Sequence, residues 1–173
     1  MESSGAYTKK VIETFQHPHN YGSIKNADGI GKVGNIVCGD IMKLYIKVGR
    51  NPIRKPSVSN GASKKMETLK DIKFETFGCV AAIATSSIIT DIAKGKTIEE
   101  ALKITKENVV DSLEGLPKIK FHCSVLAVDA LSEAIYDYFF KNNKPIPENL
   151  SKRHERIKKE KEIIEKRYKK WLK

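Results

Sequence analysis

The sequence predicts an α+β fold, because segments with the period of strands precede segments with the period of helices. Residues 42–48 and 72–76 alternate apolar and polar side chains, which is typical of half-buried antiparallel strands. Residues 79–93 and 124–140 carry apolar side chains at helical spacing, and a charged helical pattern ends the chain. The length of 173 residues suits one domain with an appendage.

The first third of the chain predicts one helix followed by strands. Residues 6–16 carry apolar side chains at helical spacing and predict a short helix. Glycines at positions 22, 29, 31 and 34 indicate a loop-rich stretch that leads into a first strand over residues 33–38. Gly39 and Asp40 then predict a tight, exposed turn into the strand at 42–48.

The connection between the second and third strands is expected to be long. Residues 49–70 contain the pairs Asn51-Pro52, Lys55-Pro56 and Asn60-Gly61 and few apolar side chains. This composition predicts a mobile hairpin loop of unusual length.

The second half of the chain predicts helices. Residues 79–93 are apolar or small nearly all round, which indicates a buried central helix that ends at Gly95. Thr97 and Glu100 form a capping-box pattern for a further helix that carries Ala101, Leu102 and Ile104. In the last core helix, over 124–140, the side chains expected to face water are those of Asp129, Ser132, Glu133 and Asp137.

Charge divides the chain into a domain over residues 1–150 and a basic helical tail over residues 151–173. The 32 Lys and Arg exceed the 21 Asp and Glu by 11, and the tail contributes 7 of this surplus. Its apolar residues recur every seven positions, which predicts a helix with one narrow apolar seam. Such a helix either packs on its own domain or only adds solubility, with docking of a partner or of nucleic acid as the alternative. His154 is expected to be exposed there. Aromatic residues do not interleave with the basic ones, so nucleic acid is the less favoured partner.

Three cysteines are too few for a disulfide framework and predict free thiols in a reducing compartment. The chain also shows no apolar stretch of the roughly 18 to 20 residues that a membrane span needs, and its first residues lack a secretory signal. We therefore expect a cytoplasmic protein with no membrane partner.

The cysteines lie at boundaries between the predicted elements, with polar ligand types beside them. Cys38 precedes the Gly39 turn, Cys79 joins a strand to a helix, and Cys123 begins the last helix. Asp40 and His122 complete a set that suits zinc or an iron–sulfur cluster, and the donors alone do not choose between them. Three thiolates instead of four indicate a cluster that is released easily. Ordinary buried cysteines are the alternative.

Four stretches resemble IscU/NifU-type iron–sulfur cluster assembly scaffolds, namely residues 15–22, 33–44, 74–79 and 116–124. The resemblance covers about residues 6–141 and implies a compact α+β fold in which helices pack against a three-stranded antiparallel sheet. It also implies a function. A cysteine desulfurase supplies persulfide sulfur, iron joins it, a two-iron two-sulfur cluster forms, and the cluster passes to apo-proteins. Such a protein is a carrier and not an enzyme.

The resemblance also assigns roles to residues. It implies that Cys38, Cys79 and Cys123 are cluster ligands, with Cys123 the candidate persulfide acceptor. Asp40 matches the carboxylate associated with release, and His122 matches an auxiliary or fourth ligand. A homodimer of the loaded form and zinc in the cluster-free form stay open, as does a zinc-binding sulfur-acceptor or regulatory protein that uses the same residues.

Two features distinguish this chain from other scaffolds of this type. Lys118 stands where the motif recognised by an Hsc-type chaperone has a second proline, so dependence on that chaperone is not predicted. The presence of His122, together with an insertion between the first and second cysteines, favours the IscU/NifU branch over the SufU branch.

Overall fold

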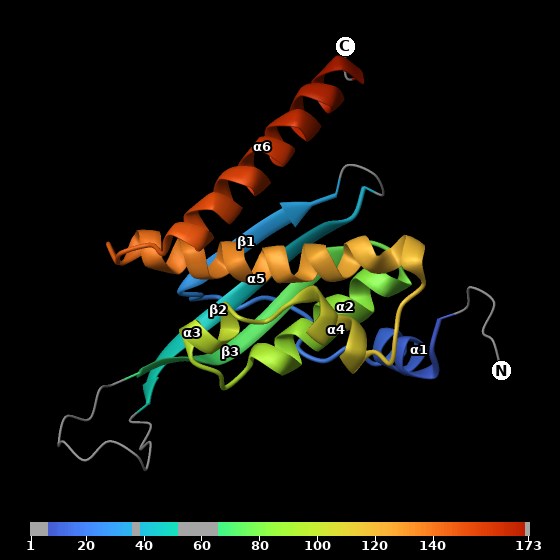
Figure 1. Cartoon of the computed structure of the whole chain (residues 1–173), viewed down its shortest axis with the longest axis horizontal. Helices are drawn as coiled ribbons and strands as arrows, with labels where there is room; N and C mark the ends of the chain where they lie inside the picture. The colour runs from blue at the N-terminus through green and yellow to red at the C-terminus, as the bar shows by residue number, and fades with distance from the viewer. Residues whose placement is uncertain (1–6, 36–38, 52–65, 172–173) are drawn as a thin grey trace.

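The computed structural model of the chain describes residues 7–35, 39–51 and 66–171. Three strands form one antiparallel sheet in the order β1-β2-β3, with β1 at Gly29–Gly34, β2 at Ile41–Asn51 and β3 at Met66–Phe77. Helices cover one face of this sheet (Figure 1). The predicted α+β fold with a three-stranded antiparallel sheet is confirmed.

The helices begin close to where the apolar spacing predicts them, with one addition. The capping box at Thr97 closes in both directions, but its helix ends before Leu102. A short helix that was not predicted follows, capped by Thr105 and Asn108. In the described part of the chain the helices are α1 (Lys9–Gln16), α2 (Val80–Ala93), α3 (Ile98–Ala101), α4 (Lys106–Ser112), α5 (Phe121–Lys141) and α6 (Glu148–Trp171), with a 3₁₀ turn at Lys118–Lys120.

Strand β1 contains three glycines that were expected in a loop. Helix α5 crosses this strand so closely that a Cβ atom on Gly29 or Gly31 would lie 2.1 Å from a backbone oxygen of the helix. Only glycine permits this approach. The prediction of a first strand over residues 33–38 is therefore wrong at its start, and residues 36–38 lie outside the described residues.

Strands β2 and β3 place one apolar face in the core, as their alternation predicts, and Met42, Leu44, Ile72 and Phe74 are almost fully buried. The predicted loop over residues 49–70 is too long at both ends, because β2 continues to Asn51 and β3 begins at Met66. A register shift after Lys47 breaks the alternation there. Residues 52–65, where mobility was predicted, lie outside the described residues.

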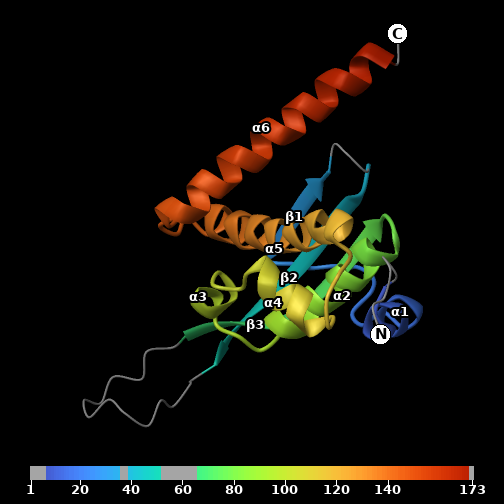
Figure 2. The same ribbon diagram turned by 45° about the vertical axis from the view of Figure 1, so that its right-hand side comes forward.

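Helix α5 lies across β1 and β2, and α6 packs on the side of α5 that was expected to face water. Asp129, Ser132 and Glu133 bond to residues of α6, and Asp137 accepts a hydrogen bond from the backbone of β1. His154 of α6 bonds to Glu133 and is half-buried, so the predicted exposure of these five side chains is wrong. The charged C-terminal helix itself is confirmed, and it continues beyond the sheet in both views (Figures 1 and 2).

These elements bring several chain segments together at one end of the sheet. Ile41 at the start of β2 pairs with Phe77 at the end of β3, and α2 begins three residues after Phe77. None of the helices in the described ranges combines the length and the apolarity needed to cross a membrane.

Candidate metal centre

Two thiols and one carboxylate meet at this end of the sheet. Cys79 Sγ lies 3.8 Å from Cys123 Sγ, and Asp40 Oδ2 lies 3.7 Å from the first sulfur and 3.9 Å from the second. Cys79 is the N-cap residue of α2, Cys123 lies in the first turn of α5, and Asp40 immediately precedes β2. Cys38, two residues before Asp40, lies outside the described residues.

His122 joins this group. One ligand atom each of His122, Asp40 and Cys123 lie within 4.8 Å of one another. The Nε2 atom of His122 is buried and has no hydrogen-bond partner among the described residues, which is unfavourable for a polar atom unless a ligand satisfies it. Soft thiolates together with an imidazole and a carboxylate suit zinc and iron. The side chains present therefore fit a metal ion or a cluster.

Two glycines shape the loops that carry these ligands. Gly39 has φ +73°, a left-handed conformation that favours glycine. A Cβ atom on Gly78 would lie 2.8 Å from Cβ of Ala82 and 3.0 Å from Cγ of Asp40. Asp40 packs into this space and is only 5% exposed. The predicted exposed turn at Asp40 is therefore wrong, because the missing side chain of Gly78 admits the carboxylate to the interior.

The two thiols differ in accessibility. Cys123 is 1% exposed, whereas Cys79 is half-buried. The last core helix was expected to begin at Ser124 but begins at Phe121, so Cys123 lies within its first turn and against the core. Of the two thiols that the structure describes, Cys79 is therefore the one that a reagent or a partner reaches first.

Lys120 and Tyr7 interact with the centre electrostatically, and sequence reasoning missed both. The negative charge of Cys79 raises the pKa of Lys120, and desolvation opposes that rise. Burial raises the pKa of Tyr7, the charge of Lys120 lowers it, and the negative charges of the centre add to the rise. Lys120 could have been predicted to lie near the site, because it is two residues before the predicted ligand His122. Nothing in the sequence near Tyr7 indicates that Tyr7 lies there.

Exposed apolar side chains accompany the ligands along the chain. Phe77 is 82% exposed, Ile119 75%, Ile41 58% and Phe121 43%. Each lies within three residues of a predicted ligand, and we call these four residues the apolar rim. Exposed apolar groups that gather in this way mark interaction sites. The centre thus lies in a surface suited to contact with another protein.

The chain is similar in sequence to known proteins. Residues 6–145 match the family described as the NifU-like N terminal domain. The iron-sulfur cluster assembly scaffold protein IscU 1 of Archaeoglobus fulgidus is 57% identical over 138 residues, which cover 80% of each chain. The iron-sulfur cluster assembly scaffold protein IscU of Haemophilus influenzae is 44% identical over 136 residues, which cover 77% of this chain and 95% of the relative.

A solved structure supports the fold. The crystal structure of a nitrogen-fixing NifU-like protein (N-terminal) from Brucella abortus has a TM-score of 0.58 at 19% identity, and the alignment covers 78% of this chain and 94% of that one. The resemblance to IscU/NifU-type scaffolds is thereby confirmed by sequence, and the fold by structure. This chain belongs to the family of NifU-like N-terminal domains.

Proposed function

We propose that the chain is a scaffold on which an iron–sulfur cluster is assembled and from which the cluster is transferred to apo-proteins. The observation that carries the proposal is the convergence of Asp40, Cys79, His122 and Cys123 from three separate segments, with a buried imidazole nitrogen that lacks a partner. The relatives named as IscU scaffolds support the same role. The proposed role is that of a carrier and not of an enzyme.

The proposed cargo is a two-iron two-sulfur cluster held by Cys38, Cys79 and Cys123. Asp40 or His122 supplies the remaining bond. Cys38 enters this set because it lies two residues before Asp40. Lasting clusters are usually held by four thiolates, so a site with three is expected to release its cluster readily. In the cluster-free form the same donors suit zinc in tetrahedral geometry.

Sulfur is proposed to arrive as the persulfide of a cysteine desulfurase. A scaffold thiolate attacks the outer sulfur of that persulfide, which forms a new S–S bond and releases the thiolate of the donor. Cys123 is the proposed acceptor. Because Cys123 is 1% exposed, this attack requires Cys123 to become more accessible than it is in this conformation. The apolar rim is a suitable docking surface for the desulfurase and then for apo-acceptors.

The proposal also extends to the assembled form of the protein, its location and its partners. A homodimer of the loaded form stays a prediction, and so does the cytoplasmic location, which follows from free thiols. Neither an Hsc-type chaperone nor nucleic acid is proposed as a partner. The family match does not favour the zinc-binding regulator considered above.

Anaerobic reconstitution of the full chain with ferrous iron, cysteine and a cysteine desulfurase tests the proposal. Charge-transfer absorption with about two iron and two sulfide per occupied site is expected. Cys79→Ser and Cys123→Ser are each expected to abolish the stable cluster, because a hydroxyl is a poor substitute for a thiolate. Ala101→Ser, which places a hydroxyl at a buried position in α3, is the control and should form the cluster normally. Tight zinc binding without any cluster would contradict the proposal.

A further inference from the structure

The two described thiols of the metal centre lie in contact with one another. Cys79 Sγ and Cys123 Sγ are 3.8 Å apart, although 44 residues separate them in the sequence. Oδ2 of Asp40 lies 3.7 Å from the first sulfur and 3.9 Å from the second, so one carboxylate oxygen accepts a hydrogen bond from each thiol. Cysteines can be joined by a disulfide only where their side chains point towards one another, as these two do.

The packing of two helices holds this pair together. Cys79 is the N-cap residue of α2, and Cys123 lies in the first turn of α5. Thr85 of α2 is 1% exposed, and its Oγ1 donates a hydrogen bond of 3.2 Å to the carbonyl oxygen of Cys123. The contact between the two sulfurs therefore follows from how α2 and α5 meet in the core.

We propose that Cys79 is a resolving thiol, which attacks the inner sulfur of a persulfide on Cys123, closes a Cys79–Cys123 disulfide and releases the outer sulfur as hydrogen sulfide. The inference deepens the proposed function and rests on it for the arrival of the persulfide. The inner sulfur of that persulfide is Sγ of Cys123, the atom that Sγ of Cys79 contacts. A thiol held against its target reacts faster than a free thiol at ordinary concentrations.

The atoms and electrons of this step balance within the chain. The S–S bond of the persulfide breaks, and a new S–S bond joins the two cysteines. The outer sulfur is reduced while Sγ of Cys79 is oxidised. The hydrogen of the persulfide and the hydrogen of the thiol both leave with the outer sulfur as hydrogen sulfide. Cys79 thus supplies the electrons that turn the delivered sulfur into the sulfide that a cluster contains.

The step has a consequence for what must follow it. The disulfide withdraws two ligands from the metal centre until a reductant opens it. A dithiol reductant restores both thiols by thiol–disulfide exchange and is itself oxidised to a disulfide. Cys79 is half-buried, so its sulfur is the one that the reductant reaches. A dithiol reduction therefore comes between the release of sulfide and the binding of the cluster.

The first test uses the full zinc-free chain and a cysteine desulfurase that carries a persulfide and has been separated from free cysteine. After mixing without iron, hydrogen sulfide is measured, the protein is denatured and alkylated, and its cysteine peptides are identified by mass spectrometry. We expect one hydrogen sulfide for each disulfide between Cys79 and Cys123, with Cys38 alkylated.

Variants then assign the step to Cys79. In Cys79→Ser the persulfide should stay on Cys123, and hydrogen sulfide should appear roughly a hundredfold more slowly, because the attacking group is no longer held in place. Ala101→Ser, which introduces a hydroxyl at a buried position in α3, is the control and should behave like the unchanged chain. Circular dichroism verifies that each variant is folded, and alanine replaces serine in a cysteine variant that unfolds.

A second measurement needs neither a desulfurase nor a persulfide. Oxidised glutathione forms a mixed disulfide with an accessible thiol, and Cys79 is more exposed than Cys123. In the unchanged chain Cys123 should displace the glutathione and close the same Cys79–Cys123 disulfide. In Cys123→Ser the glutathione should remain on Cys79.

The outcomes separate this inference from the proposed function. A persulfide that persists on Cys123 of the unchanged chain, or hydrogen sulfide released equally fast from folded Cys79→Ser, would overturn the resolving role. A chain that accepts no persulfide from the desulfurase on any cysteine would contradict the proposed route of sulfur. The glutathione measurement would then still decide whether the pair can close, and a mixed disulfide that persists in the unchanged chain would overturn the resolving role.

Discussion

Asp40 approaches the two described thiols of the metal centre, those of Cys79 and Cys123, through a single carboxylate oxygen. A carboxylate is a harder donor than a thiolate and holds an iron–sulfur cluster less durably. We therefore expect Asp40→Ala to lengthen the lifetime of the assembled cluster and to slow its transfer to an apo-acceptor, each by roughly tenfold. Both rates are measured from the visible absorption of the cluster, side by side for the variant and the unchanged chain.

Asp111→Ala is the control for this experiment, because it removes an exposed carboxylate of α4 that makes no hydrogen bond or ion pair with a ligand among the described residues. It should leave both rates unchanged. If Asp40→Ala instead loses its cluster faster than the unchanged chain, Asp40 is a ligand that retains the cluster and has no role in its release.

The types of ligand could be predicted at the scale of single residues, but their burial could not. Cysteines at element boundaries with Asp40 and His122 beside them are visible in the sequence. The burial of Asp40 depends on contact with Cys79 and Cys123, which lie 39 and 83 residues further along the chain. It also depends on the space that Gly78 leaves open. No local pattern contains that information, because it arises only when the three segments meet.

At the scale of elements, Gly31 allows β1 to touch the backbone of α5. A Cβ atom there would lie 2.1 Å from the oxygen of Ala130 and 2.7 Å from the nitrogen of Ala134. Backbone atoms inside a helix cannot yield separately, so Gly31→Ala should lower the free energy of unfolding by about 3 kcal/mol. Gly34→Ala is the control in the same strand, since its nearest neighbour would be 3.7 Å away. Urea unfolding followed by circular dichroism compares the two, and equal losses would show that α5 can shift.

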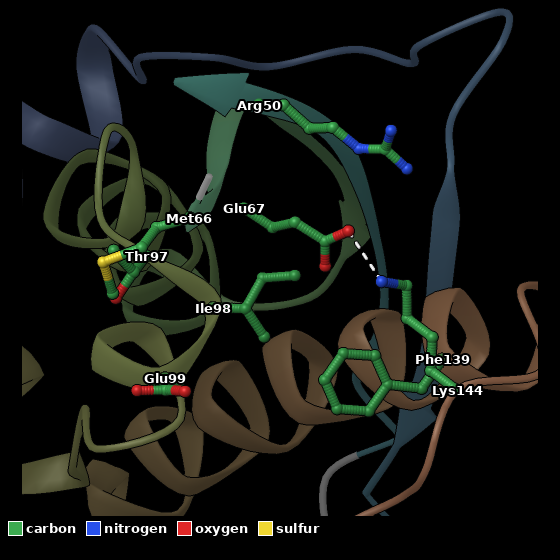
Figure 3. Close-up of a pocket in the computed structure, with 8 residues that line it drawn as sticks. All are labelled: Arg50, Met66, Glu67, Thr97, Ile98, Glu99, Phe139 and Lys144. Carbon is green, nitrogen blue, oxygen red and sulfur yellow. Dashed lines mark hydrogen bonds and ion pairs between the residues drawn. The ribbon is translucent and has the colours of Figure 1, made fainter. Parts of the chain in front are cut away.

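A second prediction at this scale concerns the contact between α5 and β3. Tyr138 donates a hydrogen bond to Glu67, which also pairs with Lys144 (Figure 3). Burial, then the hydrogen bond and the charge of Glu67, raise the pKa of Tyr138 to about 12. The ordinary value is about 10, so the folded state keeps a proton that the unfolded chain loses. Stability from this group is complete below about pH 10 and is lost as the pH rises towards 12.

Tyr138→Phe should remove this alkaline component. Between about pH 10 and 12 the free energy of unfolding of the unchanged chain should fall more steeply than that of the variant, by up to about 1.4 kcal/mol per pH unit. Tyr21→Phe serves as the control because Tyr21 is 55% exposed. Denaturant titrations at several pH values give the slopes. Parallel slopes for Tyr138→Phe and the unchanged chain would show that Tyr138 ionises equally in the folded and unfolded states.

The elements that could be predicted are those whose period reflects burial on one side. Strand β2 and helix α1 are of this kind. The start of strand β1 could not be predicted, because several glycines in a short stretch are typical of a loop. Here Gly29 and Gly31 instead allow the close contact with α5. The polar side of α5 was wrongly predicted to face water for a related reason. Asp129 and Ser132 are polar, but they form hydrogen bonds with residues of α6.

At the scale of the whole molecule, the fold class followed from the order of strand and helix patterns, but no pattern along the chain shows that the ligands meet at one end of the sheet. That meeting point is set by the antiparallel pairing of Ile41 with Phe77 and by the direction of α2 and α5 across the sheet. Helix α6 then adds a layer on α5 beyond the residues that match the family.

At the end of the sheet away from the metal centre, β2 leads into the connection to β3. Asn51 and Met66 are register partners, so the strands pair up to both ends of residues 52–65. The metal centre lies at the other end of these strands, beside Ile41 and Phe77.

Replacing residues 52–65 with an Asn-Gly turn should leave the yield of reconstituted cluster unchanged. It should raise the free energy of unfolding by about 1 kcal/mol, because a shorter loop costs less entropy to close. Urea unfolding and anaerobic reconstitution measure the two quantities. A folded variant that no longer forms the cluster would show instead that residues 52–65 take part in assembly.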